Sequence, residues 1–129
     1  MARAEIILDS SVVIDLLLQE PMAVAWAKDI DYSRLSVTSI TLMEVLRGAR
    51  NKREMDVIGR YLARFEHLHL LREDSIWAVR QFRALWLSHQ IGINDCLIGA
   101  IAARTQYPVY TLNGKDFLPF SEIITVKPY

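Results

Sequence analysis

The sequence has few of the features that mark secreted and membrane proteins. It contains one cysteine in 129 residues, which excludes an internal disulfide framework and indicates a reducing compartment. Its most apolar segments, 6–18 and 97–103, are interrupted by aspartate or are too short to cross a bilayer core of roughly 30 Å. The N-terminal residues lack the apolar stretch of a secretion signal. We therefore expect a cytoplasmic protein with no membrane partner.

The chain also lacks an excess of charge of either sign. Lys plus Arg and Asp plus Glu each total 15, so the formal net charge is zero and no global field attracts a polyanion. Any contact with nucleic acid must come from a local patch. With 52% apolar residues, the length suits one compact unit, and we expect a single domain over residues 1–129.

Short apolar runs alternate with helical patterns along the chain. The expected strands are 6–8, 35–38, 67–71, 108–111 and 123–126. The expected helices are 10–18, 21–30, 39–48, 52–65, one from 74 or 75 and one from 94 or 95 to 103. Such alternation predicts an α/β fold of three α/β/α layers, with a mainly parallel central sheet of about five strands.

For the last two helices the sequence also predicts the cap residues and the apolar positions. Asp74 or Ser75 caps the helix after the third strand. The apolar residues of that helix are Ile76, Val79, Phe82 and Trp86. Asn94 or Asp95 begins the next helix, which is apolar nearly all round and is therefore expected to be buried.

Four acidic residues stand close to the predicted strand ends. Asp9 follows the first strand, Asp95 opens a helix, and Asp116 comes shortly after the strand that ends at Thr111. Glu44 lies early in the helix after the second strand. Residues that follow separate parallel strands converge at one edge of the sheet, so these carboxylates can meet there. Taken singly, each acid also suits a structural role, as a helix cap, a solvated helix residue or a turn residue.

Carboxylates that gather in this way need a cation between them. Two like charges about 4 Å apart repel by roughly 4 kcal/mol at an effective dielectric of about 20. Oxygen ligands without a His or Cys cluster favour Mg²⁺ or Mn²⁺ over Zn²⁺. Such a site can activate a water molecule and neutralise a leaving oxygen, so phosphodiester hydrolysis is the reaction it suits.

Four segments together resemble the motifs of the PIN domain, and specifically of the VapC toxins of toxin–antitoxin pairs. The segments are 6–14, 39–48, 93–102 and 111–117, and the resemblance covers nearly the whole chain. It implies a Mg²⁺- or Mn²⁺-dependent endoribonuclease that hydrolyses RNA with a metal-activated water. Asp9, Glu44 and Asp95 would be the principal metal-binding and catalytic acids, and Asp116 would complete the site, with Asn113 sharing that role.

The same resemblance implies further contacts and partners. Ser10 and Thr111 would position acids, water or substrate through their hydroxyl groups. A purely structural role, as a helix cap and a strand-end residue, explains them equally well. Apart from the resemblance, the basic cluster at 47–53, with Arg47, and Lys115 are candidates for contact with RNA phosphates, and a solvated helix end is an equally good account of the cluster. The implied partners are RNA, a second copy of the chain in a homodimer, and a VapB-like antitoxin that directs an arginine at the carboxylates.

A receiver-like signalling module is the alternative function. In that interpretation Asp9 accepts a phosphoryl group beside a bound Mg²⁺, and Lys115 serves as the accompanying lysine. A receiver, however, needs paired acids before its acceptor strand and has no use for Glu44. Phosphorylation by a small phosphodonor without RNA cleavage would favour it.

Overall fold

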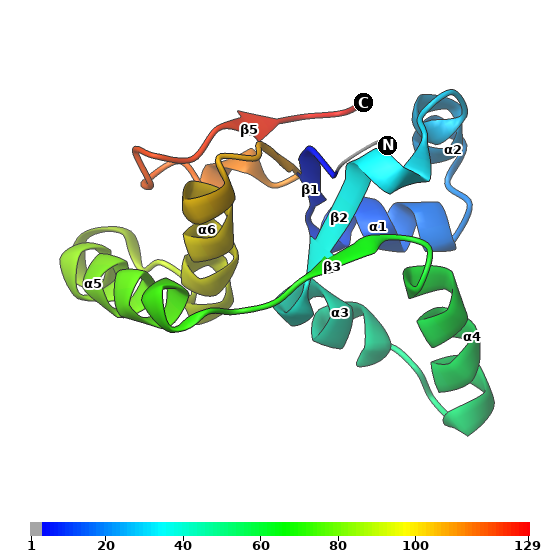
Figure 1. Cartoon of the computed structure of the whole chain (residues 1–129), viewed down its shortest axis with the longest axis horizontal. Helices are drawn as coiled ribbons and strands as arrows, with labels where there is room; N and C mark the ends of the chain where they lie inside the picture. The colour runs from blue at the N-terminus through cyan, green and yellow to red at the C-terminus, as the bar shows by residue number, and fades with distance from the viewer. Residues whose placement is uncertain (1–3) are drawn as a thin grey trace.

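A five-stranded sheet forms the centre of the protein, and a computed structural model describes it over residues 4–129 (Figure 1). The first three residues of the N-terminal segment lie outside the described part. The strands are β1 (Ile6–Leu8), β2 (Leu35–Thr38), β3 (Glu66–Leu68), β4 (Val109–Tyr110) and β5 (Thr125–Val126). Their order is β3-β2-β1-β4-β5 and all four pairings are parallel. The predicted parallel sheet is confirmed, with β1 at its centre.

Helices cover both faces of this sheet. Residues 4–129 form α1 (Ser10–Leu17), α2 (Pro21–Ala27), α3 (Ser39–Leu46), α4 (Lys52–Leu62), α5 (Arg72–His89) and α6 (Ile93–Thr105), with short 3-10 turns η1 (Tyr32–Arg34) and η2 (Gly114–Asp116). In Figure 1, α5 and α6 lie on one side of the strands and α1, α2 and α4 on the other. The α/β/α layering is therefore as the sequence predicts.

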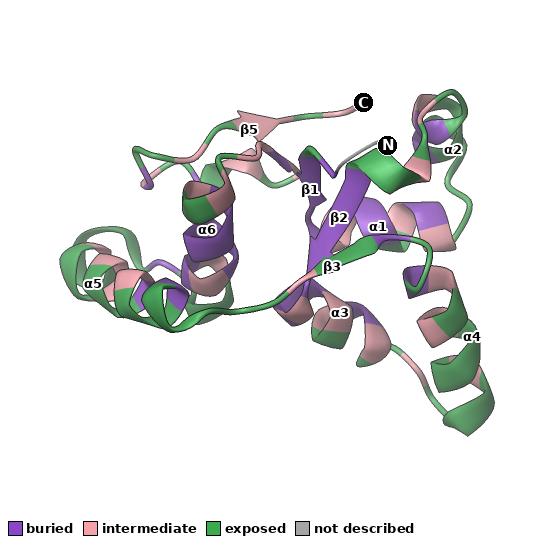
Figure 2. Ribbon diagram, viewed as in Figure 1, coloured by how far each residue is buried: buried purple, intermediate pink, exposed green. Residues whose placement is uncertain are grey.

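The alternation of side chains along β1 separates the two halves of the core. Ile6 and Leu8 belong to the apolar cluster with α1, α2 and α4, whereas Ile7 belongs to the cluster with α5 and α6. The central strands are buried on both faces, as Figure 2 shows for β1 and β2. Ser36 on β2 is fully buried and donates to the carbonyl of Ile6 at 2.7 Å, which satisfies its hydroxyl.

The apolar positions predicted for α5 are wrong in part. Phe82 packs against the core cluster that contains α6, whereas Ile76, Val79 and Trp86 are exposed, Val79 by 59%. The packed face also carries Asp74, which is 1% exposed and accepts from Arg104 of α6, from Nε at 2.8 Å and from Nη2 at 3.0 Å. An ion pair therefore joins the apolar contacts between α5 and α6.

The starts of α5 and α6 also differ from prediction. Asp74 is not the cap of α5; it lies in the first turn and accepts from the Leu71 backbone N–H at 2.8 Å. Gly92 stands at the N-cap position of α6 and the helix begins at Ile93, so Asp95 lies within its first turn. No helix among residues 4–129 combines the length and apolarity that crossing a membrane requires.

Candidate active site

Asp9 lies at the centre of the carboxyl edge of the sheet, because it directly follows the central strand β1. It occupies the N-cap position of α1 in extended conformation, makes no side-chain capping bond there, and is 7% exposed. The Asp9 side chain therefore does not cap α1, which was the structural alternative to a role in the site. A buried carboxylate at this edge has to be stabilised by other groups.

Two hydroxyl groups hold the Asp9 carboxylate from opposite ends of the chain. Thr111 Oγ1 donates to Asp9 Oδ2 at 2.8 Å, and Ser11 Oγ donates to the same oxygen at 3.1 Å. The Thr111 hydroxyl in turn accepts from the Asn113 N–H at 2.9 Å, and that of Ser11 from the Leu112 N–H at 3.1 Å. The backbone after β4 thus fixes both hydroxyls, and through them the orientation of Asp9.

Glu44 reaches the same edge from α3, which starts directly after β2. Thr38 caps that helix by accepting from the Thr41 N–H at 3.2 Å. Glu44 Oε2 accepts from Asn94 Nδ2 at 3.4 Å, whereas Oε1 is buried and has no hydrogen-bond partner among the described residues. Burial raises the pKa of Glu44, and the Asp9 charge raises it further against the lowering effect of Asn94.

The charges of the other three acids all act on the pKa of Asp95. Burial raises its pKa from an ordinary 3.8 to about 7, and the charges of Asp116, Asp9 and Glu44, in that order, add to the effect. Those acids come from η2, from the end of β1 and from α3. Three carboxylates from separate elements therefore lie close enough to Asp95 for their charges to act on it, and this repulsion destabilises its charged form.

These acids do not form a closed coordination shell. Among residues 4–129, no group of three or more His, Cys, Asp and Glu side chains is arranged to enclose a metal ion. Mg²⁺ commonly keeps several waters and takes only one or two carboxylates directly, so it does not require such a shell. The unpaired, buried Oε1 of Glu44 and the all-oxygen donor set fit a hard divalent cation.

The remaining predicted site residues lie around this cluster. Asp116 is half-buried at the end of η2, and its N–H donates to the Asn113 carbonyl at 3.0 Å. Asn113 itself is exposed and contributes its backbone N–H to Thr111. Lys115 and Arg47 are exposed, and the Arg47 charge lowers the pKa of Glu44. Two cationic side chains therefore accompany the acids.

Sequence reasoning did not include Ser11 or Asn94 among the site residues. It named Ser10, whose hydroxyl lowers the pKa of Glu44, whereas the hydroxyl bonded to Asp9 is that of Ser11. Adjacent residues in a first helical turn point about 100° apart, so the sequence does not show which serine faces the acid. Asn94 directly precedes Asp95, and this position is the feature of the sequence that could have identified it as a site residue.

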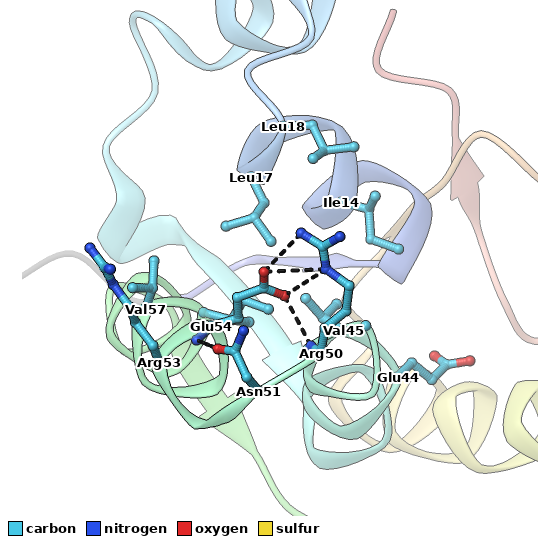
Figure 3. A pocket seen from close by; sticks show the side chains of 12 residues that line it. Ile14, Leu17, Leu18, Glu44, Val45, Arg50, Asn51, Arg53, Glu54 and Val57 are labelled. Carbon is cyan, nitrogen blue, oxygen red and sulfur yellow. Dashed lines mark hydrogen bonds and ion pairs between the residues drawn. The ribbon is translucent and has the colours of Figure 1, made fainter.

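An apolar groove runs beside the acidic cluster between α1, α3 and α4 (Figure 3). Its volume is about 760 Å³, and Glu44 lies at its edge. Arg50 crosses it to Glu54, with Nη2 and Oε2 3.0 Å apart. The apolar lining residues are Ile14, Leu17, Leu18, Val45, Val57 and Ile58. A surface of this kind suits a partner segment with apolar side chains.

Several known proteins are similar to this chain in sequence or in structure. A "Ribonuclease VapC" of Rickettsia bellii is 29% identical over 131 residues, which span 94% of this chain and 96% of that protein. Among solved structures, a DNA-bound VapBC from Salmonella typhimurium matches with a TM-score of 0.81 and 22% identity over 98% of this chain and 99% of the other. A toxin-antitoxin complex from Klebsiella pneumoniae matches with a TM-score of 0.75 and 24% identity over 95% and 97%. The sequence matches the PIN domain over residues 6–121, and the chain therefore belongs to the PIN domain family.

Proposed function

We propose that this protein is an endoribonuclease that depends on Mg²⁺ or Mn²⁺ and acts in the cytoplasm as the toxin of a toxin–antitoxin pair. The proposal is supported by the charges of Asp116, Asp9 and Glu44, which come from other elements and, after burial, raise the pKa of Asp95 to about 7. The likeness to a ribonuclease VapC over 94% of the chain supports the same activity.

In this proposal Asp9, Glu44, Asp95 and Asp116 hold the cation. When bound, the cation would activate the attacking water and offset the negative charge that develops on the leaving oxygen. The protein contributes the orientation of its acids: Ser11 and Thr111 fix Asp9, and Asn94 holds one oxygen of Glu44. Preoriented ligands lower the reorganisation needed during the reaction.

Arg47 and Lys115 would supply the contacts to RNA. Both are exposed, and the charge of Arg47 already acts on Glu44. Phosphate groups that approach an acidic site need cations at its rim, since the carboxylates alone would repel them. RNA binding should therefore weaken as the salt concentration rises.

We further propose that an antitoxin segment occupies the groove of Figure 3. The apolar lining of the groove suits apolar side chains, and Glu44 at its edge suits a cationic one. Two similar solved structures are toxin–antitoxin or VapBC complexes, which supports such a partner. The exposed apolar residues of α5, among them Val79 and Trp86, offer a surface for the expected homodimer.

The receiver-like alternative is not favoured. A receiver has the strand order 2-1-3-4-5 of the flavodoxin type, whereas this sheet has the order 3-2-1-4-5. The phosphoacceptor hypothesis also does not explain why Glu44 lies at the carboxyl edge of the sheet.

The decisive test compares Asp9→Asn with Asp56→Asn in an RNA cleavage assay. Asp56 is an exposed acid on α4 and its side chain pairs with Lys52 at 3.7 Å, so it serves as a matched control. Asp9→Asn should lose cleavage in Mg²⁺ or Mn²⁺ and stay folded, Asp56→Asn should keep it, and EDTA should stop the wild type. Wild-type cleavage by Asp9→Asn would refute the proposal.

The partner has its own test. A short reading frame for a DNA-binding protein next to this gene should encode an inhibitor, and its product should stop RNA cleavage when mixed with the protein. Val57→Glu puts a charge on an exposed residue of the groove wall, so the variant should cleave RNA and resist that inhibitor. Equal inhibition of the variant would argue against the groove.

A further inference from the structure

Gly92 stands directly before α6, where the backbone gives no reason for a glycine. Its φ of −74° and ψ of 144° lie in the extended region that any residue adopts. Conformational freedom is therefore not what this position requires. Its neighbour Ile91 is 4% exposed and anchors the segment in the core, so the position of the loop is fixed.

The space that a side chain would need at position 92 is occupied by Asp95. A Cβ atom on Gly92 would stand 3.0 Å from Asp95 Oδ2 and 3.6 Å from its Cγ. Even a weak C–H···O contact keeps carbon and oxygen about 3.3–3.6 Å apart. A methyl group at position 92 would therefore push the Asp95 carboxylate away by a few tenths of an ångström. Gly59 on α4 offers a contrast, because a Cβ there would meet nothing within 4 Å.

The position of the Asp95 carboxylate matters because the charges of three other acids act on it. Its carboxylate folds back towards the loop that precedes its own helix. The preceding residue, Asn94, bonds to Glu44 at 3.4 Å, so the start of α6 positions two acids of the site at once. A shift of the Asp95 side chain would change its relation to both Glu44 and Asp116.

We propose that Gly92 is a positioning residue of the site: its missing side chain leaves the space in which the Asp95 carboxylate lies facing Asp116, Asp9 and Glu44. This inference rests on the proposed function, because it assigns the orientation of Asp95 to cation binding. Gly92 touches neither the cation nor RNA in this account. It acts through Asp95 alone.

The test measures Mn²⁺ binding to the full chain by isothermal titration calorimetry. Gly92→Ala should bind Mn²⁺ about 10-fold or more weakly than the wild type, the usual range for residues that orient metal ligands. Its kcat for RNA should fall with KM unchanged, since the change does not touch RNA. Gly59→Ala, in which the new methyl group meets no atom, should bind Mn²⁺ like the wild type.

A second variant distinguishes the loss of space for Asp95 from a weaker N-cap of α6. Glycine is a better N-cap than alanine, so Gly92→Ala also weakens the start of α6, whereas serine is a strong N-cap that still carries a Cβ. Gly92→Ser should therefore be as poor in Mn²⁺ binding as Gly92→Ala. Recovery of Mn²⁺ affinity in Gly92→Ser, or affinity within twofold of the wild type in Gly92→Ala, would overturn the inference.

Crystal structures of the variants distinguish this inference from the proposed function. A wild-type protein that binds no Mn²⁺ would overturn the proposed function. The Asp95 carboxylate should still be displaced in Gly92→Ala and unmoved in Gly59→Ala. An Asp95 side chain that keeps its place in Gly92→Ala would overturn the inference whatever the metal data show.

Discussion

Replacing Asp95 with asparagine should stabilise the metal-free protein at pH 8. The folded state raises the pKa of Asp95 from 3.8 to about 7, chiefly by burial and then by the charges of Asp116, Asp9 and Glu44. The folded protein therefore binds a proton more tightly than the unfolded chain does. The wild type should lose stability as the pH rises from about 4 to about 7, whereas asparagine carries no charge to penalise.

The size of the effect follows from the same values. A rise from 3.8 to about 7 corresponds to at most about 4 kcal/mol at a pH above both values. Asp95 is half-exposed, and solvent screens such a group, so we expect about 1–2 kcal/mol at pH 8. The difference between the two proteins should vanish near pH 4, where the carboxyl group is protonated in both the folded and the unfolded state.

Urea unfolding in EDTA at several pH values measures this difference directly. Mn²⁺ should then reverse the order, because a ligand at 100 times its Kd stabilises the folded state by about 2.7 kcal/mol and the variant lacks one ligand. The reasoning is refuted if metal-free wild type is as stable as Asp95→Asn at pH 8, or if the difference does not depend on pH.

Two further predictions concern residues outside the predicted set. Ser11→Ala removes one of the two hydroxyl groups that donate to Asp9 Oδ2, and it should weaken Mn²⁺ binding by about 10-fold in calorimetry. Ser75 is exposed, so Ser75→Ala serves as the control, and an equal loss of Mn²⁺ affinity in that variant would show an unspecific effect. Arg104→Met leaves the Asp74 carboxylate buried without its partner and should lower the free energy of unfolding by about 3 kcal/mol in urea titrations. The double variant with Asp74→Asn should recover part of that loss, and an additive loss would contradict the ion-pair account.

The strands and the positions of the acids could be predicted because they depend on local pattern. The run Ile6–Leu8 is apolar on both faces, so its burial in a parallel sheet and the place of Asp9 at its end follow from the sequence. Likewise, Thr111 was expected to position an acid by analogy, and its hydroxyl does donate to Asp9.

The errors concern choices that only tertiary contacts make. The packed face of α5 includes Asp74, whose partner Arg104 lies 30 residues away, and the sequence does not show that Phe82 packs on the core whereas Val79 is exposed. The bond from Asn94 to Glu44 spans 50 residues and leaves no periodic pattern in either segment. The role proposed for Gly92 leaves no signal either, because a single sequence does not reveal which carboxylate needs its space.

The bond between Thr111 and Asp9 spans 102 residues, and this distance has a consequence during synthesis on the ribosome. The central strand β1 emerges early, but its neighbour β4 and the hydroxyl of Thr111 emerge only when most of the chain has been made. Pairing of such distant segments is slow, since loop closure must precede it. If the proposed function holds, the site cannot be complete in a nascent chain until Thr111 and Asp116 have been made.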